Sequence, residues 1–167
     1  MARYPRHIDI HAELVSGKVN FSMEEDSKPV GKKNGVECLV FDKTEKGMKK
    51  DDVHEVHFQL RTKKGCDIAF TKNTRNAMWV EKVDSIPNPC PCPDECDPDP
   101  DFYVEDVNEA QKRITVINKN MEIGYYAFRL NFVPEGSDDI VAGDHYISYD
   151  PITQNQNGGI LIGIDNG

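Results

Sequence analysis

The stretch from Arg113 to Val133 constrains the fold most, because strand-like alternation, turn chemistry and aromatic content coincide there. Side chains two residues apart lie on the same face of a strand, so strict alternation of large apolar residues marks a buried face. The stretch therefore predicts two strands joined by a turn, a central hairpin. The apolar face of its second strand carries Tyr126, Phe128, Leu130 and Phe132, of which Phe128 and Phe132 are expected in the core.

The rest of the chain also favours short strands. Ten prolines, twelve glycines and short apolar runs argue against a helical bundle and for an all-β fold. A second hairpin is expected at Lys63-Lys64-Gly65, and a chain of 167 residues fits one domain. We therefore predict one all-β domain over 1–167, with strands near 7–15, 19–23, 36–41, 53–62, 66–71, 76–83, 102–107, 113–133, 146–149 and 160–164.

A short motif within the central stretch resembles a known architecture. Glu122, Gly124, Tyr126 and Phe128 follow one another at steps of two. This pattern resembles the entry into strand F of immunoglobulin-like domains, where a tyrosine corner is found. The resemblance implies an immunoglobulin-like, Greek-key antiparallel β-sandwich, in which the Tyr126 hydroxyl bonds the backbone of the preceding turn. It implies no particular function, since one fold hosts many.

Charge is distributed unevenly along the chain. The net charge is −9, with +3 on residues 1–83 and −12 on residues 84–167. An acidic surface repels phosphate backbones, so nucleic acid is not expected as a partner. The N-terminus lacks a signal-peptide pattern, and no run approaches the roughly 20 apolar residues of a membrane span. We therefore expect a cytoplasmic protein with no membrane partner.

The long irregular segment 84–101 is rich in proline, acids and cysteine. Three thiols, Cys90, Cys92 and Cys96, could converge on zinc. The fourth ligand would be Cys66 or an adjacent carboxylate from Asp94, Glu95 or Asp97. The C-x-C-x3-C spacing lacks the usual paired C-x2-C, so a disulfide and inert surface thiols remain alternatives. The acids of this segment also offer oxygen ligands for calcium, but without the glycine-containing loop that calcium sites commonly use.

A further metal hypothesis concerns the first strand. His7, Asp9 and His11 are spaced so that all three share one face. Such a face could hold a transition metal, although a solvated polar edge has the same pattern.

The sequence gives no catalytic motif of the hydrolase, nucleotide-binding or zinc-protease kind. We therefore expect a nonenzymatic protein that acts through protein–protein contact, as a subunit or accessory component of a larger assembly. The partner would be another protein or a second copy. The contact is expected on the apolar last strand, through Ile160, Leu161, Ile162 and Ile164. A metal-binding or redox protein using Cys90, Cys92 and Cys96 is the alternative.

Native mass spectrometry tests the zinc hypothesis. If the three cysteines bind zinc, the folded protein should carry the mass of one zinc ion, and a chelator should remove it. Replacing Cys90, Cys92 and Cys96 together by serine should abolish the added mass. An apo mass with three freely alkylated thiols would exclude zinc.

Overall fold

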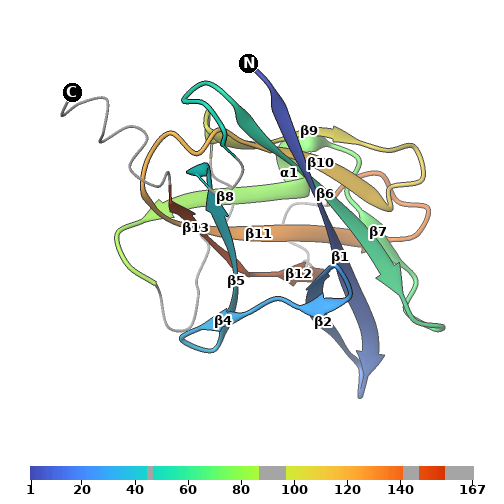
Figure 1. The fold of residues 1–167 in the computed structure, drawn as a ribbon. Coiled ribbons are helices and arrows are strands. Elements are labelled where there is room, and N and C mark those ends of the chain that lie inside the picture. The colour runs from blue at the N-terminus through green and yellow to red at the C-terminus, as the bar shows by residue number, and fades with distance from the viewer. Residues whose placement is uncertain (45–46, 87–96, 141–146, 157–167) are drawn as a thin grey trace, which may run out of the picture.

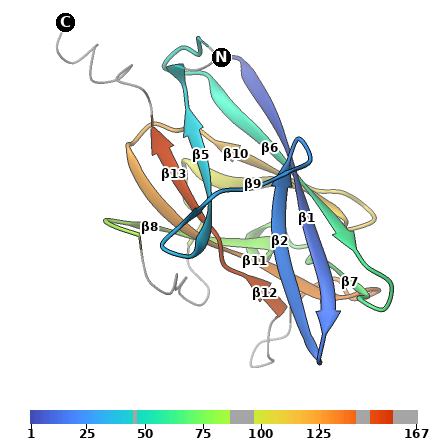
Figure 2. The same cartoon turned by 60° about the horizontal axis from the view of Figure 1, so that its bottom comes forward.

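The computed structural model describes residues 1–44, 47–86, 97–140 and 147–156, which form two β-sheets packed face to face (Figures 1 and 2). The predicted all-β sandwich is confirmed at this level. The one helix in the described ranges is the four-residue α1, Thr74–Ala77.

The first sheet has the strand order β3-β2-β1-β6-β10-β9. Its inward faces alternate as the sequence predicts; Ile8 and Ile10 of the first strand, for example, are fully buried. The strands are β1 Arg3–Val15, β2 Lys18–Glu25, β3 Lys28–Pro29, β6 Val53–Thr62, β9 Phe102–Val107 and β10 Arg113–Asn118.

The second sheet is built around one long strand, β11. One side of β11 pairs with β7 and β8, and the other side pairs with β12 and β13, after which β5 and β4 follow. The strands are β4 Lys32–Lys33, β5 Val36–Asp42, β7 Ile68–Phe70, β8 Met78–Val83, β11 Gly124–Pro134, β12 Ile147–Tyr149 and β13 Ile152–Gln156.

The predicted purely antiparallel sandwich is wrong in one respect, because both sheets are mixed. β1 lies parallel to β6, with Ile8 opposite Phe58. β13 lies parallel to β5, with Ile152 opposite Cys38. Parallel neighbours need a connection that leaves the ladder and returns, and local sequence patterns do not show such long-range returns.

Both predicted hairpins are also wrong. β10 belongs to the first sheet and β11 to the second, so the central stretch crosses between the layers instead of folding back in one ladder. β7, after the turn at Gly65, pairs with β11 and not with β6. The apolar residues of β10 and β11 therefore meet across the interior between the two sheets instead of lying side by side in one ladder. Alternation identified the buried faces but could not show which strands are neighbours.

The core lies between the two sheets. Phe128 is fully buried and Phe132 is 2 % exposed, so both core predictions are confirmed. Phe128 lies against Phe58 of the first sheet, with ring centroids 6.1 Å apart, and against Phe102 at 5.8 Å. Aromatic contacts of this kind join the layers at their centre.

A buried polar group also crosses between the layers. Asn118 of β10 and Asn155 of β13 exchange side-chain amide hydrogen bonds of 2.8 and 3.0 Å. In the crossing that follows β10, the Asn120 amide donates to the carbonyls of Phe41 and Gln156. Asn120 takes a left-handed backbone φ of 49°, which asparagine tolerates better than most residues.

The sequence analysis did not predict β13, because its polar residues Thr-Gln-Asn-Gln are typical of a loop. Its buried polar side chains include Thr153 and Asn155, and the second is satisfied by Asn118. The predicted last strand, 160–164, lies outside the described residues.

Replacing Phe128 by alanine should lower the free energy of unfolding by about 3–5 kcal/mol, because it removes a ring from the core between the two sheets. Urea unfolding at neutral pH measures the change. Ile123→Ala is the matched control, since Ile123 is 52 % exposed, and its cost should stay within about 0.5 kcal/mol. Equal costs for the two variants would contradict the assignment of Phe128 to the core.

Candidate functional site

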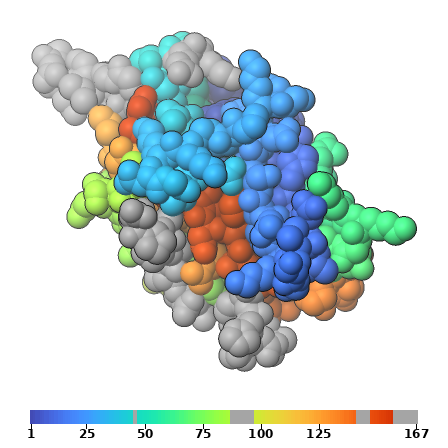
Figure 3. Space-filling view, turned by 90° about the horizontal axis from the view of Figure 1, so that it is seen from below, coloured from blue at the N-terminus to red at the C-terminus, as the bar shows by residue number. Residues whose placement is uncertain are grey.

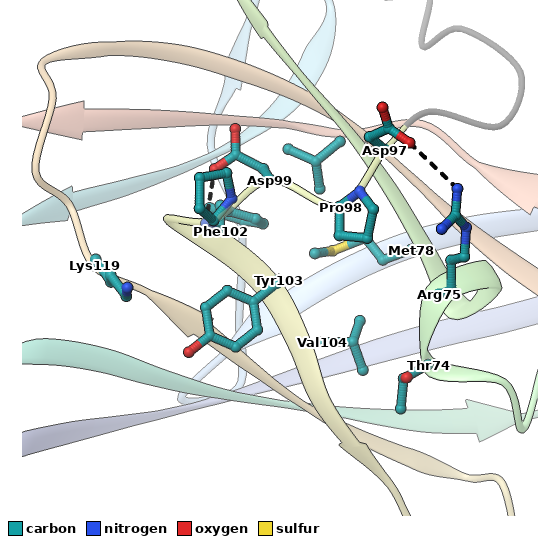
Figure 4. A pocket seen from close by; sticks show the side chains of 12 residues that line it. Thr74, Arg75, Met78, Asp97, Pro98, Asp99, Phe102, Tyr103, Val104 and Lys119 are labelled. Atoms are coloured by element: carbon teal, nitrogen blue, oxygen red, sulfur yellow. Dashed lines mark hydrogen bonds and ion pairs between the residues drawn. The ribbon is translucent and has the colours of Figure 1, made fainter.

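A hollow of about 390 Å³ lies where β8 of the second sheet and β9 of the first sheet run close to each other (Figure 4). Its floor is apolar and comes from both layers, with Met78, Val80 and Phe102. The basic side chains Arg75 and Lys119 stand at its rim. A hollow with an apolar floor and a polar rim suits an apolar group carried by a polar partner.

The floor is rigid because Phe102 is anchored in the core. Its ring is 1 % exposed and stacks on Tyr126 with centroids 5.5 Å apart. The approach to β9 is fixed by Asp99, whose carboxylate accepts hydrogen bonds from the N–H groups of Asp101 and Phe102 at 2.8 and 3.0 Å. The residues just before the strand therefore form a defined wall of the hollow.

The opposite wall is α1, which is held by the half-buried carboxylate of Asp139. Asp139 accepts hydrogen bonds from the Thr71 hydroxyl at 2.8 Å and from the side-chain amides of Asn73 and Asn76. Burial by itself would raise the pKa of Asp139, but these donors and the Ile140 N–H lower it below its ordinary value. Asp139 is thus a charged anchor for the helical turn that carries Arg75.

Cations at the rim have partners of their own. Arg75 lies 3.3 Å from the exposed carboxylate of Asp97. The Lys119 ammonium lies 6.0 Å from the centre of the Tyr103 ring, which borders the hollow on the outer face of the first sheet. Both contacts are solvent-exposed or long and are therefore weak enough to be replaced by a ligand.

One edge of β9 faces this hollow. Lys119 N–H donates to the Asp101 carbonyl at 2.7 Å, so the alternation of an antiparallel ladder turns the backbone groups of Phe102 and Val104 away from β10. The Phe102 N–H is bound by Asp99, whereas the Phe102 carbonyl and the Val104 N–H have no hydrogen-bond partner among the described residues. These two backbone groups of β9 are therefore able to pair with another strand beside the apolar floor of the hollow.

The opposite side of the sandwich is closed. Its edge strands β3 and β4 contain only two residues each, Lys28–Pro29 and Lys32–Lys33. The chain between them is bonded to both sheets, through Val30 N–H to the Met23 carbonyl and Cys38 N–H to the Gly31 carbonyl. Figure 3 shows this blue segment passing beside β12 and β13. Short strands with lysine and proline discourage pairing with another chain.

A second hollow of about 380 Å³ borders this closed side. Its main cation, Arg6, is already bonded to both carboxylate oxygens of Glu25 and to the Val40 carbonyl, and it lies over the Phe41 ring. The Arg6 contacts hold β1 against β2 and β5, so we assign this hollow a structural origin.

Of the four cysteines predicted to bind zinc, only Cys66 lies in the described ranges, so the zinc site stays a prediction. Cys90, Cys92 and Cys96 lie outside the described residues. Cys66 is a free thiol, 3 % exposed and packed in the core, and burial raises its pKa. These properties favour a structural role for Cys66, because the thiolate is the form that binds metal.

His7, Asp9 and His11 share a face, as expected, but each has a different partner. His7 stacks on His57 with centroids 5.0 Å apart, Asp9 pairs with Arg61, and His11 lies 3.3 Å from Glu24. No three histidine, cysteine or acidic side chains within the described ranges lie close enough together to hold a metal ion. In the described part of the acidic segment, Asp97 and Asp99 make the contacts given above, and Glu105 pairs with Arg3. Calcium binding stays a prediction.

A buried lysine lies at another end of the sandwich. Lys43 is fully buried, and its ammonium donates to the Lys50 carbonyl at 2.6 Å. Burial lowers the pKa of Lys43, while the charge of Asp52 opposes this effect. Its hydrogen bond fastens the connection between β5 and β6, so we assign Lys43 a structural role.

Sequence reasoning identified β9 as a short or edge strand but missed the hollow beside it. The available signal was the apolar triplet Phe102 to Val104 directly after a run of alternating aspartate and proline. The predicted contact residues Ile160, Leu161, Ile162 and Ile164 lie outside the described ranges.

Comparisons with known proteins add no name to this geometry. The chain matches no protein-family model, and a search of curated proteins found no similar sequence. In the described ranges, no helix has the length and apolar character needed to cross a membrane.

Replacing Asp139 by asparagine should destabilise the protein by about 1–3 kcal/mol at pH 7, because a charged acceptor of several hydrogen bonds is lost. The folded-state pKa of Asp139 is lowered, so its contribution is complete above the ordinary value of 3.8 and disappears as the pH falls through the folded value. The difference between wild type and Asp139→Asn should therefore shrink as the pH falls below 3.8, as measured by urea unfolding at a series of acidic pH values.

Asp138→Asn is the matched control, because this substitution removes the same charge from the exposed neighbouring residue. Its effect should be small at every pH. If the loss of stability in Asp139→Asn stays constant as the pH falls, the shape of the Asp139 side chain, and not its charge, stabilises the fold.

Proposed function

We propose that this protein is a nonenzymatic β-sandwich that acts through protein–protein contact, as a subunit or accessory component of a larger assembly. The observation that carries the proposal is the difference between its two sides. One side is closed by lysine, proline and a bonded crossing segment. On the other side, β9 has a backbone carbonyl and an N–H without a hydrogen-bond partner among the described residues, beside an apolar hollow. Proteins commonly protect such edges, so an edge left available suits contact with another chain.

The geometry of the described site fits binding better than chemistry. The floor of the hollow is made of side chains without nucleophilic or acid–base capacity, such as Val80 and Phe102. Its rim carries charges of both signs, Arg75 and Lys119 together with Asp97 and Asp99. Charges of this kind select and orient a partner.

We also propose that the sandwich is of the immunoglobulin-like, Greek-key type. Two sets of neighbours support this: β6, β10 and β9 follow the order of strands B, E and D, and β8, β11 and β13 follow the order of C, F and G. β11 then takes the place of strand F, where the motif around Tyr126 would put it.

Two departures accompany this correspondence. β1 stands beside β6 in the place of strand A but runs parallel to it. Among the described residues, the Tyr126 hydroxyl makes no hydrogen bond to the turn before β11, and the ring stacks on Phe102 instead. The alternative function, metal binding or redox chemistry through Cys90, Cys92 and Cys96, stays a prediction that zinc analysis decides.

Size-exclusion chromatography with light scattering tests the assembly, on the purified protein and on extract of the cells that make it. We expect a mass above that of the 18.9 kDa chain in at least one of the two. Deleting 158–167 should reduce that mass if the last strand forms the contact. A stable monomer at high concentration that is also monomeric in extract would overturn the proposal.

A further inference from the structure

We propose that the edge of β9 at Tyr103 is a strand-addition site, which binds a short, extended, positively charged segment of the partner protein with apolar side chains on one face. This inference rests on the proposed function and assigns that function a place and a partner class. It starts from the two free backbone groups of β9, the Phe102 carbonyl and the Val104 N–H.

These two groups flank Tyr103 and point to the same side. A residue of an added parallel strand, placed opposite Tyr103, would donate its N–H to the Phe102 carbonyl and accept from the Val104 N–H. Beyond this point the ladder is interrupted by a bulge at Glu105, since Val104 faces Val116 while Asp106 faces Thr115. A bulge ends regular pairing, so the site suits a segment of a few residues.

The hollow extends across this edge and matches the two faces of such a strand. Side chains alternate, so the residue opposite Tyr103 would lie on the outer face beside the Tyr103 ring. The residues before and after it would point inward, toward Met78 (Figure 4). Val80 also lines the hollow on this inner side. The site therefore selects the pattern apolar, variable, apolar.

The charges around the edge of β9 favour a partner segment of positive charge. Residues 97–106 contain five acids and no lysine or arginine. Within reach, Arg75 lies against Asp97, Lys119 stands over Tyr103, and Arg3 binds Glu105. Around the strand edge, the five acids therefore outnumber the three cations, although the lining of the hollow itself has two of each. Basic residues flanking the apolar pattern would be attracted to this edge.

The probe is the peptide acetyl-Lys-Val-Thr-Val-Lys-amide, titrated to millimolar concentration into the full chain labelled with ¹⁵N. We expect amide shifts at Tyr103 and Val104, slower exchange of the Val104 N–H, and no change at Val40 on the closed side. N-methylation of the central threonine removes the donor to the Phe102 carbonyl and should weaken binding about 2- to 10-fold, the effect of one hydrogen bond.

Protein variants test the other hydrogen bond. Val104→Pro removes the outward N–H at an edge position where proline is tolerated, and it should lose binding. Val104→Ala keeps that N–H and should bind within about 2-fold of wild type, since only part of the side-chain contact is lost. Circular dichroism and thermal unfolding confirm that both variants fold, and the N-methylated peptide gives an answer that does not depend on them.

Several outcomes would overturn the site. These are unchanged Tyr103 and Val104 signals, equal binding of the N-methylated peptide, or equal binding of acetyl-Glu-Val-Thr-Val-Glu-amide. If the protein assembles in extract but the peptide fails, this site is wrong and the proposed function stands. If the protein is monomeric everywhere, the proposed function itself is wrong.

Discussion

The structure depends on the burial of aromatic side chains between two sheets. Phe58 and Phe102 come from one layer and Phe128 from the other, and their rings meet at the centre of the sandwich. Apolar burial drives the layers together but does not fix how they are aligned. The Asn118–Asn155 amide pair adds a directional contact between the layers, since any other alignment would leave two buried amides unpaired.

The same core supports the proposed binding edge. Phe102 is both a buried core residue and the start of β9, so the edge of this strand is anchored in the packed interior. Asp99 fixes the chain before it, and Asp139 fixes the helical turn across from it. The hollow is thus preformed, which lowers the entropy lost when a flexible segment binds. On the other side, short lysine- and proline-containing strands leave little to pair with.

The sequence predicted which face of each strand is buried better than it predicted which strands pair with each other. Alternation placed Phe128 and Phe132 in the core because period-two burial is a local property. It gave no sign that β10 and β11 separate into different sheets, because that depends on which apolar faces meet. It also missed β13, whose buried asparagine is acceptable only because Asn118 stands opposite. The candidate site was missed for a related reason, since its floor combines residues from β8 and β9, which are distant along the chain.

By itself, the sequence determined the all-β class, the positions of most strands and the residues that must be buried, since these follow from alternation, turn residues and the scarcity of helix-forming periods. Only the tertiary structure decided the mixed pairing of the strands, the crossing between layers and the difference between a closed and an open side. These depend on contacts between segments more than a hundred residues apart, such as the pairing of Arg3 with Glu105. Such contacts form through the summed burial of whole faces, which no single stretch of the chain encodes.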